Sequence, residues 1–99
     1  MKENQMRHLS FDDLLILSLL ANGTSTVTKV AKNLCLTQPA ITRRIRKMER
    51  VFAEKIVMRA NRGIKMTEFG QRTALRAQRA ILAMTEEIVN ESECVQYAN

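Results

Sequence analysis

Aromatic residues are scarce in this chain, which has three Phe, one Tyr and no Trp among its 99 residues. A core must therefore be built from Leu, Ile, Val, Met and the three Phe, and a chain of this length suffices for one small domain. The hydrophobic fraction of 45% is ordinary for a folded protein, so the composition excludes a disordered tail.

Histidine and cysteine are also few, with one His and two Cys. We expect His8 at the surface or in packing, and Cys35 and Cys94 are too far apart in sequence to form a recognisable metal or redox motif. Cys35 lies between Leu34 and Leu36 and is expected to be a small apolar filler. Because no nucleophile–base spacing and no glycine-rich phosphate loop is present, the sequence predicts neither an enzyme nor a cofactor.

Targeting signals are absent from the sequence, which has no signal peptide, transmembrane run or lipidation motif. This predicts a cytoplasmic protein with reduced thiols and no membrane partner. There are no internal repeats or low-complexity tracts.

The charge is distributed unevenly along the chain. Residues 29–79 contain fourteen Lys or Arg against three Glu, a net charge of +11, whereas residues 80–99 carry four Glu and no cation. A basic middle with an acidic end fits a surface that binds a polyanion and a far end with another role, although a merely soluble basic protein has the same balance.

The segment from Thr37 to Glu49 predicts a helix with an arginine-rich front and a hydrophobic back. Thr37 suits the N-cap, and Pro39 suits the first turn, where a missing N–H costs nothing. The positions that can be buried are Ala40, Ile41, Ile45 and Met48. The positions on the opposite side are Thr42, Arg43, Arg46, Lys47 and Arg50. Such a helix start suits the DNA major groove, although an ordinary surface helix with a solvated cationic face is an alternative.

Three further helices are predicted around this segment. Ser10 and Asp13 form a capping box for a helix that continues to about Ala21, where Asn22-Gly23 supplies a left-handed stop. Its apolar residues surround the helix, so we expect its second side to meet another subunit. A short helix follows the cap candidate Thr26, and Cys35-Leu36 forms the turn of a helix-turn-helix. The third is a long helix beginning after the cap candidate Thr67, with part of its apolar stripe overhanging the small domain.

Between the helices, residues 56–67 predict a strand, a turn at Ala60-Asn61-Arg62-Gly63 and a second strand. A two-stranded ribbon is marginal unless it packs on helices. Packed in this way, it forms a wing that carries Arg59, Arg62 and Lys65.

With these elements in place, the sequence resembles the amino-terminal DNA-binding domain of LysR-type transcriptional regulators over roughly residues 7–90. The helix-turn-helix part of the family pattern is met by Thr26, Val27, Thr28, Val30-Ala31, Leu34, Thr37-Gln38-Pro39-Ala40 and Thr42. The later part is met by Met48-Glu49, Phe52-Ala53, Ile56-Val57-Met58-Arg59 and Thr67-Glu68-Phe69-Gly70. The family prefers Gly in the turn after the helix that begins at Thr37, because Gly usually permits a positive φ there. This chain has Ala53 instead, so it departs from the family pattern at that turn.

The resemblance implies a mainly α fold, a winged helix-turn-helix with a three-helix core, a two-stranded wing and a long linker helix. The DNA-binding domain would span residues 1–67, with the helix-turn-helix at about 26–46 and the wing at about 56–67. The linker and dimerisation helix would span 68–93, followed by a flexible tail at 94–99. The effector domain of longer family members is expected to be absent from this chain.

The expected partner is double-stranded DNA, bound at a partly palindromic operator by a homodimer. We expect Gln38, Pro39, Thr42 and Arg43 against base edges, with contacts to phosphate as the alternative for each. Further DNA contacts are expected at the helix starts, on the recognition helix and on the wing: Thr26, Thr28, Thr37, Thr67, Arg46, Arg59, Arg62 and Lys65. The dimer seam is expected at Phe69, Ala77, Ile81, Met84 and Ile88.

Two other functions fit the same sequence. One is a small winged-helix metal or redox sensor that uses Cys35, Cys94 and His8, for which no further ligands stand out. The other is a protein-interaction module with vestigial DNA binding. No small-molecule effector site is expected, because the core and the dimer seam should use all the apolar residues.

Overall fold

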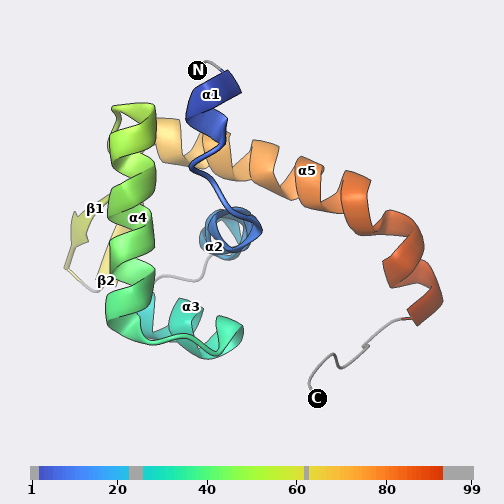
Figure 1. Ribbon diagram of the computed structural model, residues 1–99. Coiled ribbons are helices and arrows are strands. Elements are labelled where there is room, and N and C mark those ends of the chain that lie inside the picture. Colours follow the sequence, from blue (N-terminus) through green and yellow to red (C-terminus); the bar gives the residue numbers. More distant parts are fainter. Residues whose placement is uncertain (1–2, 23–25, 62, 93–99) are drawn as a thin grey trace.

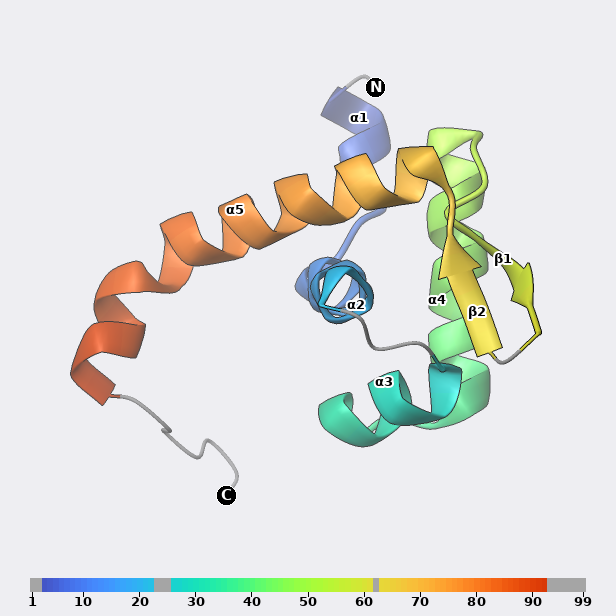
Figure 2. The ribbon, with the colours of Figure 1, turned by 180° about the vertical axis from the view of Figure 1, so that it is seen from behind.

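The computed structural model describes residues 3–22, 26–61 and 63–92, with side chains described between residues 4 and 85 of these ranges. Within them the order of elements is α1 (Glu3–Met6), α2 (Phe11–Ala21), α3 (Val27–Leu34), α4 (Gln38–Phe52), β1 (Val57–Ala60), β2 (Gly63–Met66) and α5 (Glu68–Ser92). Both ribbon views place α2 in the middle, with α4, α3 and α5 on three sides of it (Figures 1 and 2). This is the mainly helical winged fold that the sequence predicts.

Side-chain caps fix where the central helices begin. The Ser10 hydroxyl accepts from the Asp13 N–H at 3.3 Å, and the Asp13 carboxylate accepts from the Ser10 N–H at 2.9 Å. The Thr26 hydroxyl accepts from the N–H of Lys29, and the Thr37 hydroxyl accepts from the N–H of Ala40. These bonds satisfy N–H groups that a helix start leaves unpaired, and they confirm the predicted caps.

The C-terminal end of the first predicted helix differs from the prediction. Asn22, the C-cap of α2, has φ −84° and ψ 13°, so the predicted left-handed stop is wrong at this residue. Its N–H is satisfied by carbonyls of the last turn instead, which needs no left-handed residue. Gly23 lies outside the described residues, and the short helix α1 was not predicted.

One hydrophobic core joins all the long helices to the wing. Its fully buried members come from the inner faces of α2, α3, α4 and α5 and from the start of the hairpin: Ile16, Leu17, Leu20, Val30, Ala31, Ile41, Ile45, Met48, Ile56, Ala74 and Ala77. Phe52 and Phe69 meet edge to face beside the core, with ring centroids 5.4 Å apart. The scarce aromatic residues therefore help α4 to hold the first turn of α5.

The hairpin pairs β1 with β2 in antiparallel register, from Val57 opposite Met66 to Ala60 opposite Gly63. Each strand begins one residue away from its predicted limits. Val57, Ile64 and Met66 pack against the core, which supplies the support that an isolated ribbon lacks.

Among the described residues, no helix combines the length and the apolar content that crossing a membrane requires.

Thr67 joins the wing to α5. Its N–H donates to the Ile56 carbonyl at 2.9 Å, its hydroxyl donates to the Lys55 carbonyl, and the same hydroxyl accepts from the Gly70 N–H. Gly70 is buried against this junction, where an added Cβ would collide with the Ile56 carbonyl oxygen. The close approach of α5 to the wing therefore requires glycine at this position.

Gly70→Ala is expected to lower the free energy of unfolding by about 1–3 kcal/mol, because the obstacle is backbone and cannot rotate away. Urea denaturation followed by circular dichroism measures the change. Gln71→Ala, an exposed position in the same turn, is the control and should stay within about 0.5 kcal/mol of wild type. A Gly70→Ala protein as stable as the control would show that the junction can relax.

Ala53, the C-cap of α4, adopts the left-handed conformation, with φ 57° and ψ 37°. This conformation costs a residue with a Cβ about 1–2 kcal/mol relative to glycine. The chain therefore keeps the sharp turn after α4 without the residue that suits it best.

Ala53→Gly is expected to raise the free energy of unfolding by about 0.5–1 kcal/mol, since the relieved strain exceeds the added entropy of the unfolded chain. Thermal and urea unfolding both measure this gain. Ala83→Gly, at an exposed position within α5, should instead lower it by about 1 kcal/mol. Loss of stability in both variants would contradict the strain argument.

Candidate nucleic-acid interface

The outer face of α4 carries a cluster of exposed polar and cationic side chains. Its inner face is fixed in the core by Ile41, Ile45 and Met48, all at most 4% exposed. The opposite side forms a shallow depression lined by Gln38, Pro39, Thr42, Arg43, Arg46 and Arg50. Five of these six are exposed and Thr42 is half-buried. The predicted base-contacting residues therefore lie together on one solvent-facing surface.

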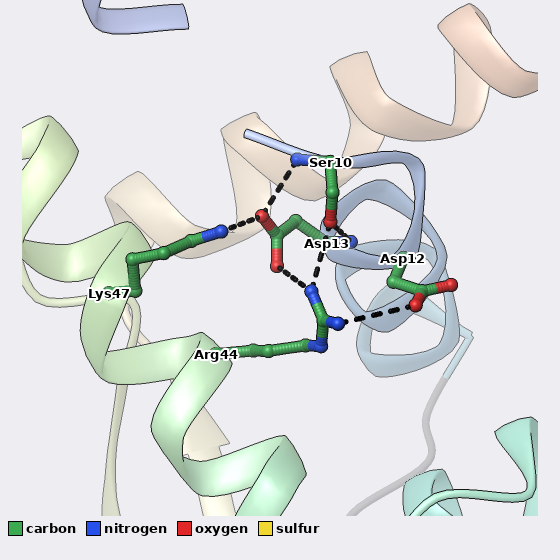
Figure 3. Close-up of polar contacts among 5 residues, drawn as sticks. All are labelled: Ser10, Asp12, Asp13, Arg44 and Lys47. Atoms are coloured by element: carbon green, nitrogen blue, oxygen red, sulfur yellow. Dashed lines mark hydrogen bonds and ion pairs between the residues drawn. The ribbon is translucent and has the colours of Figure 1, made fainter. Parts of the chain in front are cut away.

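One flank of α4 is bound to the start of α2 (Figure 3). The Lys47 ammonium lies 2.8 Å from the Asp13 carboxylate, and the Arg44 guanidinium lies 3.6 Å from it. Arg44 also donates to the Ser10 hydroxyl at 3.0 Å and lies 3.5 Å from the Asp12 carboxylate. Two of the cations on the recognition helix are thus paired within the protein, which sequence reasoning did not foresee.

The other flank of α4 is bound to the wing through Glu49. Its carboxylate accepts from the Ile56 N–H at 2.8 Å and from the Val57 N–H at 3.4 Å, and it lies 3.9 Å from the Lys55 ammonium. These bonds fix the first strand relative to the helix. The family's Leu-Glu element, Met48-Glu49 here, was the only sequence signal for this role.

The described cations of the wing, Arg59 and Lys65, are both exposed but project from opposite faces of the ribbon. Arg59 pairs with Ile64 and Lys65 with Met58, and residues on successive pairs alternate between faces. The face of Arg59 is the one that packs on the helices, whereas Lys65 lies on the outward face. The predicted contact of Arg62 lies outside the described residues.

The threonines predicted to bind phosphate lie at helix starts, as expected, but three hydroxyls already serve as caps. Thr26, Thr37 and Thr67 each accept a backbone N–H of their own helix. The single proton of the Thr67 hydroxyl is donated to the Lys55 carbonyl at 2.6 Å, with the Ile56 carbonyl 3.2 Å away, so this hydroxyl is engaged inside the protein as both donor and acceptor. Thr28 is exposed on α3.

Cys35 does not fill the core, and the prediction that it does is wrong. Its side chain is exposed, and its backbone is left-handed, with φ 57°, at the turn between α3 and α4. The flanking Leu34 and Leu36 pack inward while the turn directs Cys35 outward. Within the described residues, no group of three His, Cys, Asp or Glu could hold a metal ion; Cys94 lies outside them.

Some apolar residues of α5 are buried within the protomer, and others are exposed to solvent. Ala77 is buried in the core and Phe69 packs on Phe52, so the protomer itself uses these two positions that were predicted for a dimer seam. Met84 is 65% exposed and Ile81 half-buried. Leu75 and Leu82, which the prediction omitted, are 53% and 64% exposed. The side chain of Ile88 lies outside the described residues.

An apolar cleft of about 590 Å³ lies between α1, α2, α4 and α5. Its walls include Met6, Leu9, Leu14, Val51, Phe69 and Ala80. The core by itself therefore leaves apolar surface open, and the expectation that core and dimer seam together use all the apolar residues stays a prediction. The short helix α1, which the sequence did not predict, builds one wall of the cleft.

The family model described as bacterial regulatory helix-turn-helix protein, lysR family, matches residues 11–71. The matched segment covers α2, both helices of the helix-turn-helix, the wing and the start of α5. It therefore includes every element that forms the surface described above.

Three proteins illustrate the likeness. An uncharacterized HTH-type transcriptional regulator of Escherichia coli strain K12, YbhD, is 36% identical over 67 residues, which are 68% of this chain and 21% of that protein. The CbnR DNA-binding domain in complex with DNA is 27% identical, with a TM-score of 0.69 over 85% of this chain and 94% of that domain. PA0477, a probable transcriptional regulator of Pseudomonas aeruginosa, is 17% identical and shares the fold, with a TM-score of 0.75 over 94% of this chain and 31% of that one. The chain thus spans about a fifth of the curated relative's length.

Proposed function

Because the chain belongs to the LysR family of bacterial regulatory helix-turn-helix proteins, we propose that it binds double-stranded DNA at a specific operator and regulates transcription. The observation that carries the proposal is the outer face of α4, where amide, hydroxyl and guanidinium groups share one exposed surface. These are the groups that recognise base edges in the major groove. The similarity to a domain in complex with DNA supports the same role.

The rigid support of α4 favours recognition of sequence over a loose electrostatic contact. Hydrogen bonds to base edges require side chains held in a fixed register, and phosphate contacts set that register. In this protein the core, the Asp13 ion pairs and the Glu49 bonds hold α4 from three sides. We expect Gln38, Thr42 and Arg43 to contact bases and the wing to contact the minor groove or the backbone.

We propose a homodimer that joins through the exposed apolar positions of α5. The second half of this helix extends beyond the other elements (Figure 2). Two recognition helices held in this way would lie about 34 Å apart and would suit a partly palindromic site. A regulator that acts on the chromosome works in the cytoplasm, at the nucleoid, and the proposed role involves no catalysis.

Gln38→Ala and Thr42→Ala are each expected to cost about 1–3 kcal/mol of binding free energy on the preferred site and much less on random duplex. The preferred site comes from selection of bound sequences out of a random DNA pool. Fluorescence anisotropy at fixed salt measures both affinities. An equal loss on both duplexes would assign these residues to backbone contacts.

Arg59→Ala is the matched control on the wing. Removing one contact to phosphate should weaken binding to all sequences alike and reduce the slope of log affinity against log salt by about 0.9. A loss confined to the preferred site would instead assign Arg59 to base recognition.

Met84→Glu is expected to convert the dimer into monomers with weaker operator binding. The side chain is exposed in the protomer, so the charge disturbs the proposed seam and leaves the core intact. Sedimentation equilibrium at micromolar concentration measures the mass. Gln71→Glu, at an exposed position near the start of α5, should remain dimeric. A wild-type chain that sediments as a monomer with DNA affinity intact would contradict the proposed dimer.

A further inference from the structure

We propose that Asp13 is a positioning residue that holds Lys47 away from the DNA backbone and so limits the sequence-independent part of DNA binding. The inference rests on the proposed function, since it concerns the same face of α4. Asp13 on α2 would affect DNA binding indirectly, by pairing with Lys47 on α4.

Lys47 is paired with the buried Asp13 carboxylate. Its ammonium lies 2.8 Å from the Asp13 carboxylate, and among the described residues Lys47 forms an ion pair with no other acid. Asp13 is fully buried, and the Lys47 side chain is 32% exposed. A buried carboxylate strongly favours retaining a paired cation, because an uncompensated buried charge is costly. Lys47 is therefore held toward α2.

Lys47 lies on α4 beside the exposed Arg43 and Arg50. Lys47 follows Arg43 by one helical turn, so the two side chains emerge on neighbouring parts of the surface. Arg43, Lys47 and Arg50 line one shallow hollow together with Arg44. A Lys47 side chain released from Asp13 would thus lie beside the base-contacting surface of Arg43, within reach of the DNA backbone.

A released Lys47 would strengthen sequence-independent binding to DNA phosphates. Contacts of Lys to phosphate raise the affinity for every duplex and add to the salt dependence, while they carry no sequence information. Asp13 thereby divides the cations of α4 into two groups. Arg43, Arg46 and Arg50 remain exposed for DNA, whereas Arg44 and Lys47 are paired inside the protein.

Asp13→Asn removes the charge and retains a side-chain oxygen that can accept the Ser10 N–H, so the cap of α2 persists. The variant is expected to bind random duplex more tightly at low salt. For each Lys47 that gains a phosphate, the slope of log affinity against log salt should become steeper by about 0.9, which means an extra three- to fourfold gain, roughly, between about 200 and about 50 mM salt. A merely destabilised protein would lose affinity instead.

Two further substitutions assign this change to Lys47. Lys47→Gln in the wild-type background should leave the slope unchanged, because the paired ammonium does not contact DNA. In the Asp13→Asn background, the same substitution should restore the wild-type slope. Asp12→Asn is the matched charge control, because Asp12 is half exposed and contacts Arg44 without contacting Lys47. It should leave the slope unchanged.

The inference is overturned if Asp13→Asn has the wild-type slope, or if Lys47→Gln alone makes the slope shallower by about 0.9. Should Asp13→Asn fail to fold, as judged by circular dichroism, the single Lys47→Gln variant decides the question. A wild-type chain whose DNA binding does not depend on salt would overturn the proposed function itself. That result would be seen with the wild-type protein alone, so it is distinguishable from a failure of the Asp13 proposal, which only the variants reveal.

Discussion

The burial of the Asp13 carboxylate constrains how the recognition helix lies against α2. An ionised carboxylate removed from water is costly unless cations and hydrogen bonds replace its hydration. Here the replacements are Lys47, Arg44 and the Ser10 N–H, and one carboxylate oxygen has the Arg44 guanidinium at 3.6 Å without a hydrogen bond. Any shift of α4 along α2 would separate the charges, so the pair specifies one arrangement of the two helices.

The sides of α4 have separate tasks as a result. The apolar side is fixed by the core, one flank by Asp13 and the other flank by the Glu49 bonds to the wing. Only the remaining side is left for an external partner. A helix that is oriented by its neighbours on three sides can present side chains in a fixed register, which recognition of base edges demands.

Local features of the fold could be predicted from the sequence, and features that depend on distant neighbours could not. The caps at Ser10, Thr26 and Thr37 were predictable because each donor lies three residues from its acceptor. The pairing of Asp13 with Lys47 joins residues 34 positions apart, so no local pattern indicates it. The same distinction applies to the candidate site, whose outer face follows from helical spacing while its bound cations do not.

Periodicity also identifies a face without identifying what covers it. The stripe of α5 was correctly placed on one side of a helix, but Ala77 meets the protomer's own core and Met84 meets solvent. Cys35 was misplaced for a related reason: two flanking leucines indicated burial, whereas the left-handed turn directs the thiol outward. The apolar cleft escaped prediction because a cavity depends on how helices meet, and α1 contributes a wall from four residues with no periodic signal.

The packing of α5 on α2 joins the proposed dimer seam mechanically to the DNA-binding face. Gln78 donates to the Ser18 carbonyl and to the Asn22 side chain, so the middle of α5 is tied to the end of α2. At its other end, α2 is tied to α4 through Asp13. A change in how two α5 helices meet would therefore move α2 and α4 as one unit, because close-packed cores transmit displacement and resist gradual deformation. The separation of two recognition helices would then be set at the seam, remote from the DNA.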